Sequence, residues 1–435
     1  MQNAKYIMQN YQSSTCEVHS GLGLSPQGGS RWGAILLLGG TAIQIPIIHK
    51  AHEMGLRVIT CDNRPDNPGH ALSDEYHNVD ITDEESVLRL AKQLSVDAVV
   101  NYSLEAGVKA AAYAQEKLGK PTSPYSSVCT LSDKKLFRRF LREHGFCTPR
   151  MITCRSKEEA LSKIQSLKFP VVVKPTDLWG SRGVTRVDAE PLHMEARLSA
   201  AIDYALSLSR GGEVIIEEFV EPCGQPIEGS AFAIDGVLTT RAWSDVYDDP
   251  KAENPITPVT FCYPSTQPAH LLDKLDSTLS RLLSLLGMKT NAYNVEARID
   301  SNGDVYLMEV APRNGGNTSH DILSLITGQD VQRAIILAAL GEDCSFMRNV
   351  PYDTFWMGHV VHTNTPGTYQ GLWTDDDFRQ RNLVRYTPFL QPGSPAGTYS
   401  GTNKTIGALH ARFATREEMM EVASNTTRYF RPIVR

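Results

Sequence analysis

The stretch from Asn294 to Asn317 constrains the fold of this chain most, because its pattern predicts two strands joined by a turn. Residues 294–300 alternate apolar and charged side chains, the Ser-Asn-Gly-Asp run that follows is typical of a turn, and residues 305–310 form a second apolar run. In the simplest register, Glu296 and Glu309 lie close together at the end away from the turn. The sequence therefore predicts a β-hairpin that carries two neighbouring carboxylates.

Two carboxylates placed together repel each other and favour a cation between them. Mg²⁺ suits such a pair, since it commonly takes one or two carboxylates together with substrate phosphates. Arg313 follows the second acid closely, and a glycine-rich run then leads into an apolar helical pattern over residues 322–340. The alternative is an exposed acidic hairpin with a solvated arginine, so the metal hypothesis depends on whether the remaining chain supplies a nucleotide site.

Length and composition are those of a globular protein with several lobes. The 435 residues are 41% hydrophobic and 21% charged, and they suggest roughly two to four domains. The net charge of −6 gives no reason to expect nucleic acid or a membrane as partner, and no apolar run approaches the roughly 20 residues that span a bilayer. The eight cysteines are scattered without a Cys-x-x-Cys pair, which argues against zinc and disulfides and indicates the cytoplasm. Residues 1–32 are expected to form a flexible extension.

The first lobe begins with a βαβ pattern. Residues 34–38 are wholly apolar, a Gly-Gly turn and a helical pattern follow, and residues 57–61 predict a second strand. A dinucleotide site with Asp62 on a ribose is the alternative, but Ala42 and Ile43 stand where later glycines of that fingerprint belong. With a further strand and two further helices up to Leu118, we expect a small parallel sheet covered by helices.

Lys174 ends an apolar strand that the pattern predicts to be buried, where an ammonium needs a partner. Gly180, Ser181 and Gly183 follow in a loop that can lay backbone N–H groups on phosphate oxygens. The lysine precedes this loop, so the pattern differs from a Walker motif. Together, strand lysine and glycine loop predict a phosphate site.

Other segments carry weaker signals. Lys134 and Lys135 lie on a helix predicted to begin at Ser132 as N-cap, and surface charge is the alternative for both lysines. Residues 214–220 predict a strand that ends in two acids, with an ordinary edge strand as the alternative. Residues 245–268 are polar and rich in proline and predict a substrate-side loop or lid.

The order of these parts resembles the ATP-grasp superfamily over about residues 33–430. A lysine on a helix is followed by a strand lysine with a glycine loop, a strand ending in Glu-Glu-Phe-Val, and a Glu…Glu hairpin with a trailing arginine. The resemblance implies a mixed α/β and α+β fold class. Its expected parts are a Rossmann-like parallel-sheet lobe (33–125), a two-lobed ATP-grasp domain (126–345, small lobe about 150–220) and a small C-terminal β-rich subdomain that closes the site (346–435).

The resemblance also implies residue roles, with ATP and Mg²⁺ (or Mn²⁺) as cofactors. The lysines hold phosphates under the glycine loop, the hinge after residue 216 grips adenine, and one acid binds ribose. The implied ATP-binding residues are Lys134, Lys174, Gly180, Ser181, Gly183, Glu217, Glu218, Phe219, Val220 and the ribose acid Glu228. The implied metal ligands are Glu296 and Glu309, and the implied catalytic residues are Arg313, Arg298 and Asn314.

One departure bears on the metal site. Many members of the superfamily carry Asn two residues after the second acid, whereas this chain has Ala311, so Asn314 or water is expected to fill the gap. The run from Ala311 to Arg313 is similar to the aminoimidazole-ribonucleotide carboxylase branch, whereas the Asn-Gly-Gly that follows is similar to the amino-acid ligases.

The second substrate is a carboxylate in this interpretation, and arginine suits its geometry. Arg241, Arg298 and Arg313 are the candidates, with a cross-strand ion pair as the alternative for Arg298. His320 is expected on the surface at a helix N-terminus, with a contact to the acceptor substrate as the alternative.

The leading hypothesis is an ATP-dependent ligase that phosphorylates a carboxylate and couples the acyl phosphate to an amine, with amino-acid or peptide-like substrates favoured. Its partners are small molecules, with neither nucleic acid nor membrane, and the resemblance favours a homodimer. A purine-pathway carboxylase or formyltransferase is the second enzyme hypothesis. A non-catalytic nucleotide-binding protein is the alternative of another class, and a NAD-dependent enzyme is least favoured.

Overall fold

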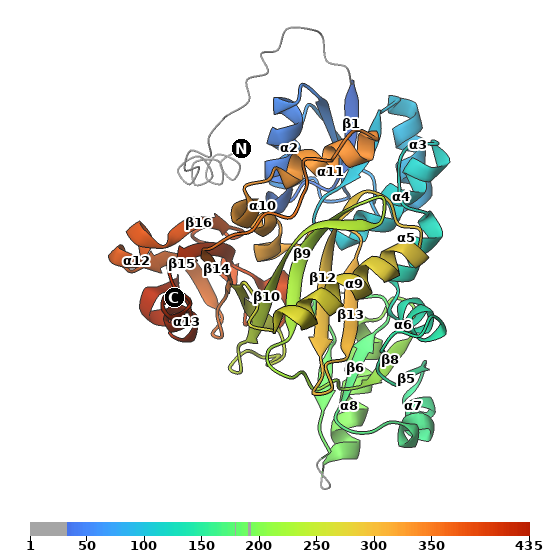
Figure 1. The fold of residues 1–435 in the computed structure, drawn as a ribbon, viewed down its shortest axis with the longest axis vertical. Helices are drawn as coiled ribbons and strands as arrows, with labels where there is room; N and C mark the ends of the chain where they lie inside the picture. The colour runs from blue at the N-terminus through green and yellow to red at the C-terminus, as the bar shows by residue number, and fades with distance from the viewer. Residues whose placement is uncertain (1–32, 179, 190–192) are drawn as a thin grey trace.

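The computed structural model describes residues 33–178, 180–189 and 193–435, so the predicted N-terminal extension lies outside the described residues. Figure 1 shows a parallel-sheet lobe at one end, a small lobe at the opposite end, and between them a large sheet that runs on into the C-terminal part of the chain. The predicted mixture of a parallel-sheet lobe with antiparallel sheets is confirmed.

The N-terminal lobe is a four-stranded parallel sheet of order β3-β2-β1-β4. Its central strands are short apolar runs buried on both faces, which is the pattern of a parallel sheet covered by helices. The strands are β1 (Ala34–Leu38), β2 (Arg57–Cys61), β3 (Glu75–His77) and β4 (Ala98–Asn101), and the helices are α2 (Ile45–Glu53), α3 (Glu84–Leu94) and α4 (Val108–Lys117).

The Gly-Gly turn after β1 is covered by the chain itself. A Cβ on Gly40 would stand 2.3 Å from the imidazole of His70, and Gly69 N–H donates to the Gly40 carbonyl at 2.7 Å. The Asp62 carboxylate accepts a hydrogen bond from Asn67 at 2.9 Å. The segment that follows β2 therefore fills the turn in which a dinucleotide site would place its pyrophosphate.

The small lobe is a second four-stranded sheet, antiparallel and of order β5-β8-β6-β7. Two helices pack its buried face, whereas the two helices that precede it in the chain pack in a different apolar cluster, with the large sheet. The strands are β5 (Met151–Cys154), β6 (Val171–Pro175), β7 (Thr185–Val187) and β8 (Val214–Glu218), and the helices are α5 (Tyr125–Ser132), α6 (Lys134–Glu143), α7 (Lys157–Lys163) and α8 (Met194–Leu208).

The central sheet has eight strands in the order β13-β12-β9-β10-β11-β14-β18-β16. Within it, Glu296 of β12 is aligned with Glu309 of β13, so the predicted hairpin register is confirmed. The strands are β9 (Ile227–Ile234), β10 (Val237–Asp248), β11 (Pro258–Tyr263), β12 (Asn291–Ile299), β13 (Val305–Ala311), β14 (Phe355–Val361), β16 (Leu383–Pro388) and β18 (Gly407–Phe413), and α9 (Ala269–Leu285) covers one face.

The C-terminal part continues this sheet across the predicted boundary at residue 345, because β14 pairs with β11. A separate three-stranded sheet, β17-β15-β19, lies beside it. Helix α11 returns to the first lobe and packs against α2 (Figure 1). The remaining elements are β15 (Gly367–Thr374), β17 (Pro395–Ala396), β19 (Phe430–Val434), α10 (Ile322–Thr327), α11 (Val331–Leu340), α12 (Asp376–Arg381), α13 (Arg416–Ser424) and α14 (Thr426–Tyr429).

Two local predictions were wrong, and a third was right only in part. The N-cap of α6 is Asp133, whose side chain accepts from Leu136 N–H at 2.8 Å, whereas Ser132 ends the preceding helix. Residues 245–268 are a loop only in part, because they include the end of β10 and strand β11, although the loop between these strands does lie on the substrate side, where Ile256 lines the cavity described below. The helical pattern over 322–340 is broken at Gly328, where φ is +69°. Within the described residues, no helix is long and apolar enough to cross a membrane.

Candidate active site

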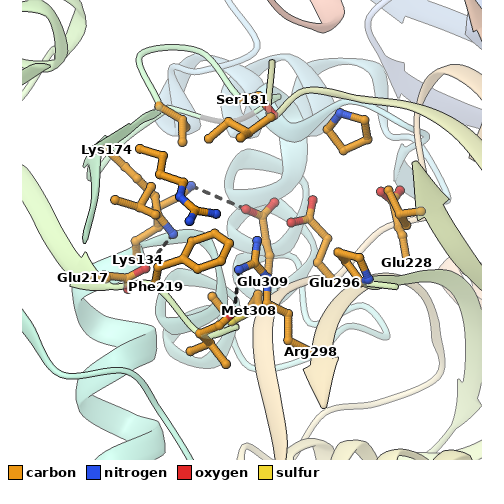
Figure 2. Close-up of a pocket in the computed structure, with 18 of the residues that line it drawn as sticks. Lys134, Lys174, Ser181, Glu217, Phe219, Glu228, Glu296, Arg298, Met308 and Glu309 are labelled. Carbon is orange, nitrogen blue, oxygen red and sulfur yellow. Dashed lines mark hydrogen bonds and ion pairs between the residues drawn. The ribbon is translucent and has the colours of Figure 1, made fainter. Parts of the chain in front are cut away.

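A cavity of about 250 Å³ lies between the small lobe and the large-lobe sheet. Figure 2 shows Lys134, Lys174 and Glu217 on one side of it, Glu309 and Glu296 in the middle, and Glu228 beyond Glu296. Gly183, Arg313 and Asn314 do not line the cavity, whereas the other predicted residues do: Lys134, Lys174, Gly180, Ser181, Glu217, Glu218, Phe219, Val220, Glu228, Glu296, Arg298 and Glu309.

Lys174 has the partner that its position requires. Its Nζ lies 2.5 Å from Glu217 Oε2, and Glu217 also binds Arg138 Nε at 2.6 Å. Burial by itself raises the pKa of Glu217, but Arg138 and Lys174 outweigh it and lower that pKa to about 2. Both carboxylate oxygens of Glu217 are thus held by cations of the protein, and the contact of the hinge with adenine stays a prediction.

Lys134 and Lys135 point to different surroundings although they are neighbours in α6. Lys134 Nζ donates to the Leu178 carbonyl at 2.7 Å and lies 3.5 Å from Glu309 Oε2, so it bridges the cavity. Lys135 Nζ instead pairs with Glu213 at 2.8 Å. The structure therefore brings Lys134 and Lys174 to the same cavity, as predicted.

The glycine loop lies against two loops of the large lobe. Asn254 Nδ2 donates to the carbonyls of Ser181 and Val184, at 3.3 and 3.4 Å. Gly180 has φ +69°, and a Cβ on it would stand 2.3 Å from Thr402 Oγ1. The loop thus covers the cavity by close backbone approach, for which glycine is required.

At the hinge, Phe219 is held between two guanidinium groups, Arg186 at 4.1 Å and Arg298 at 4.2 Å from its ring centre. Arg298 Nη1 also donates to the Val220 carbonyl at 2.7 Å. Arg298 therefore contacts the hinge rather than forming the cross-strand ion pair, and because it lines the cavity its role as a substrate-carboxylate or catalytic residue stays a prediction. The Glu218 side chain turns away and accepts from Lys168 N–H at 2.9 Å.

Three carboxylates form a row across the large-lobe sheet, since Glu228 of β9 is aligned with Glu296 and Glu296 with Glu309. Burial, reinforced by Glu309 and Glu228, raises the pKa of Glu296 to about 8. Burial also acts on Glu309, but Lys134, Arg313 and Lys174 outweigh it and lower its pKa. Glu228, which is aligned with Glu296, also accepts a hydrogen bond from Ser319 Oγ at 3.3 Å.

This placement bears on the ribose acid. Asp248 of β10 lines the cavity and interacts electrostatically with the hinge-binding Arg298. Burial raises the pKa of Asp248 to about 6, with Arg298 acting against it. Asp248 and Glu228 both line the cavity, so Asp248 is a second acid there and Glu228 as the ribose acid stays a prediction.

The donor set fits Mg²⁺ that is shared with a substrate. Glu296 and Glu309 are hard oxygen ligands on adjacent strands, and their mutual repulsion favours a cation between them. Among the described residues, no group of three or more His, Cys, Asp and Glu side chains could hold a metal ion alone. Two carboxylates completed by substrate phosphates is the arrangement common for Mg²⁺.

Arg313 and Asn314 face the parallel-sheet lobe. Arg313 Nε pairs with Glu105 Oε2 at 2.7 Å. Asn314 is bound at both ends of its amide by Ser103, accepting from its N–H at 2.9 Å and donating to its Oγ at 2.7 Å. The amide of Asn314 is thus engaged with Ser103, so the prediction that it replaces the missing metal ligand is not supported.

Two further predictions were wrong. Arg241 pairs with Asp276 at 2.7 Å and Asn349 at 2.8 Å and does not line the cavity. His320 is buried, with 2% exposure, next to Asp321 and under β18, rather than on the surface.

Two lysines of one lobe, a row of carboxylates on the facing sheet and a glycine loop over the cleft define a nucleotide-binding protein with the ATP-grasp architecture. Residues 167–321 match the family model of the ATP-grasp domain. The chain therefore carries an ATP-grasp domain over these residues.

Similar proteins differ in their substrates. The formate-dependent phosphoribosylglycinamide formyltransferase of Burkholderia vietnamiensis is 26% identical over 288 residues, which are 64% of this chain and 68% of that protein. The L-amino acid ligase of Bacillus licheniformis matches 93% of this chain and 99% of its own, with a TM-score of 0.74 and 18% identity. The biotin carboxylase domain of the Hydrogenobacter thermophilus 2-oxoglutarate carboxylase, solved with MgADP and bicarbonate, matches 93% of this chain and 91% of its own, with a TM-score of 0.72 and 16% identity. At these identities the solved structures show the fold.

Proposed function

We propose that this protein is an ATP-dependent, ADP-forming ligase that couples a carboxylate to an amine, with amino-acid or peptide-like substrates. The observation that carries the proposal is the convergence of Lys134 and Lys174 with Glu296 and Glu309 on one cavity. The structural similarity to an L-amino acid ligase along nearly the whole chain supports the substrate class.

In the proposed reaction, the substrate carboxylate takes the γ-phosphoryl group of ATP, and the amine then displaces phosphate from the acyl phosphate. Lys134 and Lys174 bind phosphate oxygens, so that developing charge is stabilised by cations that are already in place. Arg313 does not line the cavity, but it interacts electrostatically with Glu309 and Glu228, and on this ground the proposal places it beside the transferred group. Glu296 and Glu309 would hold Mg²⁺, which would supply positive charge to the phosphates. The loop around Gly180 excludes water from the acyl phosphate, which hydrolyses otherwise.

The test uses the two neighbouring lysines of α6. Lys134→Ala removes a cation of the cavity, and we expect phosphate release from Mg-ATP to fall by about 100-fold, the scale of one lost electrostatic contact to the transferred group. Lys174→Ala and Glu309→Ala are expected to abolish most turnover as well. The matched control is Lys135→Ala, which removes the pair with Glu213 and should keep turnover within about twofold. The acceptor mixture contains all amino acids and a dipeptide panel. Near-normal release by the folded Lys174 and Glu309 variants refutes the proposal.

A second candidate is a purine-pathway carboxylase or formyltransferase. It is supported by the Ala-Pro-Arg run at residues 311–313 and by the similarity to a formyltransferase of that pathway. ADP release that depends on glycinamide or aminoimidazole ribonucleotide, and not on amino acids, selects this candidate. Nucleotide binding without phosphate release on any of these panels selects a non-catalytic protein instead.

We also propose a homodimer, on the strength of the family resemblance. The mass of the protein in solution, measured by light scattering during gel filtration, tests it.

A further inference from the structure

The parallel-sheet lobe reaches the active site through the loop that follows β4. Ser103 in this loop has φ +57°, a backbone conformation that is uncommon for a residue with a side chain. It binds both ends of the Asn314 amide, and Glu105 binds Arg313. The loop lies at the carboxyl end of a parallel strand, the edge at which open α/β sheets place functional residues. One loop of the first lobe therefore holds the two residues that follow the metal-binding hairpin.

Arg313 lies among three carboxylates. Glu105 accepts its Nε–H at 2.7 Å, whereas Glu309 and Glu228 interact with it electrostatically. The side chains of Arg313 and Glu105 are 11% and 8% exposed, so this pair is shielded from water. A shielded guanidinium that loses one carboxylate partner is drawn to the others, because an uncompensated buried charge is strongly unfavourable.

We propose that Glu105 is a positioning residue for Arg313. By binding Nε, Glu105 holds the guanidinium beside Glu309, where the proposed function places the transferred phosphoryl group, and keeps it from pairing with Glu309, which would hold Mg²⁺. This inference rests on the proposed function, since it assigns the supporting contact of a residue that the proposal places at the γ-phosphoryl group.

The first experiment measures binding, which is independent of turnover. Isothermal titration of the full-length protein gives the affinities for Mg-ADP and for Mg-AMPPNP, a non-hydrolysable analogue that carries the γ-phosphoryl group. We expect Glu105→Gln to lose the preference for Mg-AMPPNP over Mg-ADP, with the Mg-ADP affinity unchanged within twofold, because only the analogue reaches Arg313. A purely structural role lowers both affinities together.

The second experiment measures phosphate release from Mg-ATP with the amino-acid mixture. Glu105→Gln should lower kcat by about 10- to 100-fold with little change in the KM for ATP, the usual effect of removing the partner of an active-site group. In an Arg313→Lys background the same substitution should add little further loss, because Glu105 acts through Arg313. Glu105→Asp keeps the negative charge but shortens the side chain by one methylene, so we expect a loss of kcat smaller than that of Glu105→Gln. This second variant also provides the test if Glu105→Gln does not fold.

The matched control is Asp276→Asn, which breaks the similar Arg241–Asp276 pair outside the cavity and should change neither readout. If wild-type protein binds Mg-AMPPNP more tightly than Mg-ADP and every folded Glu105 variant keeps this preference, the inference is wrong and the proposed function stands. If wild-type protein binds neither nucleotide, the proposed function fails and the inference with it.

Discussion

At the scale of single residues, the buried group Arg138–Glu217–Lys174 makes stability depend on pH. The pKa of Glu217 is lowered to about 2 in the folded protein, from an ordinary value near 4.5. Its contribution to the free energy of unfolding is therefore complete above about pH 4.5 and is lost as the pH falls towards 2. At about 1.4 kcal/mol per pKa unit, the full contribution is roughly 3 kcal/mol.

We expect urea midpoints of wild-type protein to fall more steeply between pH 5 and 3 than those of Glu217→Gln, which has no proton to gain at that position. The Gln variant is less stable at neutral pH, because Arg138 and Lys174 lose their common partner in a buried site. Other acids titrate in both proteins, so the difference between the two curves isolates Glu217. If the urea midpoints of the two proteins fall in parallel with pH, Glu217 does not make stability depend on pH.

Local patterns explain which site residues the sequence predicts. Lys174 is an ammonium at the end of an apolar strand, and Glu296 and Glu309 belong to one hairpin, so neighbours in the chain define them. Arg138 and Glu105 were missed because their partners, Glu217 and Arg313, are 79 and 208 residues away. The single signal for Arg138 is its position on the face of α6 that buries Phe137 and Leu141. His320 was misplaced because β18, which buries it, follows about 90 residues later.

At the scale of elements, the position of the glycine loop requires both the positive φ of Gly180 and the absence of a side chain next to Thr402. Gly180→Ala places a Cβ in a strained φ region and against Thr402 Oγ1, so the closed position of the loop is disfavoured. We expect phosphate release to fall by about tenfold, which corresponds to about 1.4 kcal/mol.

Gly212 is the matched control for this substitution. It has φ +62° but open space around it, so Gly212→Ala carries the backbone strain without the clash. It should cost about 1 kcal/mol of stability and keep turnover within twofold. The double variant Gly180→Ala with Thr402→Ala removes the clash and should recover part of the activity. Equal losses in Gly180→Ala and Gly212→Ala show that the contact with Thr402 is irrelevant.

Boundaries of elements were the weaker part of the sequence prediction. Ser132 and Asp133 are both good N-caps, and the choice between them depends on where the preceding helix α5 ends, which is set by tertiary packing. The sequence of residues 245–268 predicts a polar loop because the strands in it, the end of β10 and β11, carry polar residues although both lie in the middle of a sheet. Asp245, for instance, is buried and accepts from Ser265 Oγ at 2.6 Å.

At the scale of the whole molecule, the eight-stranded sheet joins the ATP-grasp domain to the C-terminal part. The predicted division places residues before and after 345 in different domains. The pairing of β11 with β14 crosses this division along four aligned residue pairs. Cys262 of β11 belongs to the same apolar cluster as Met357, Leu409 and Phe430. A strand pairing of this kind cannot be predicted from the sequence, because the residue pattern of a strand does not specify which other strand it pairs with.

This continuity predicts how the protein responds to a cut. A protease site inserted after Asp353, in the loop between α11 and β14, allows the folded chain to be cleaved at that point. We expect the two pieces to elute together in gel filtration and to keep the Mg-ADP affinity of the uncut protein, because the β11–β14 pairing and the shared apolar cluster hold them. Each buried side chain of that cluster contributes about 1.5–3 kcal/mol, so the association is expected to survive dilution. A chain that ends at residue 353 should instead aggregate, since β11 becomes an unpaired edge strand. Separation of the cleaved pieces in buffer without denaturant shows that the C-terminal part is an independent domain.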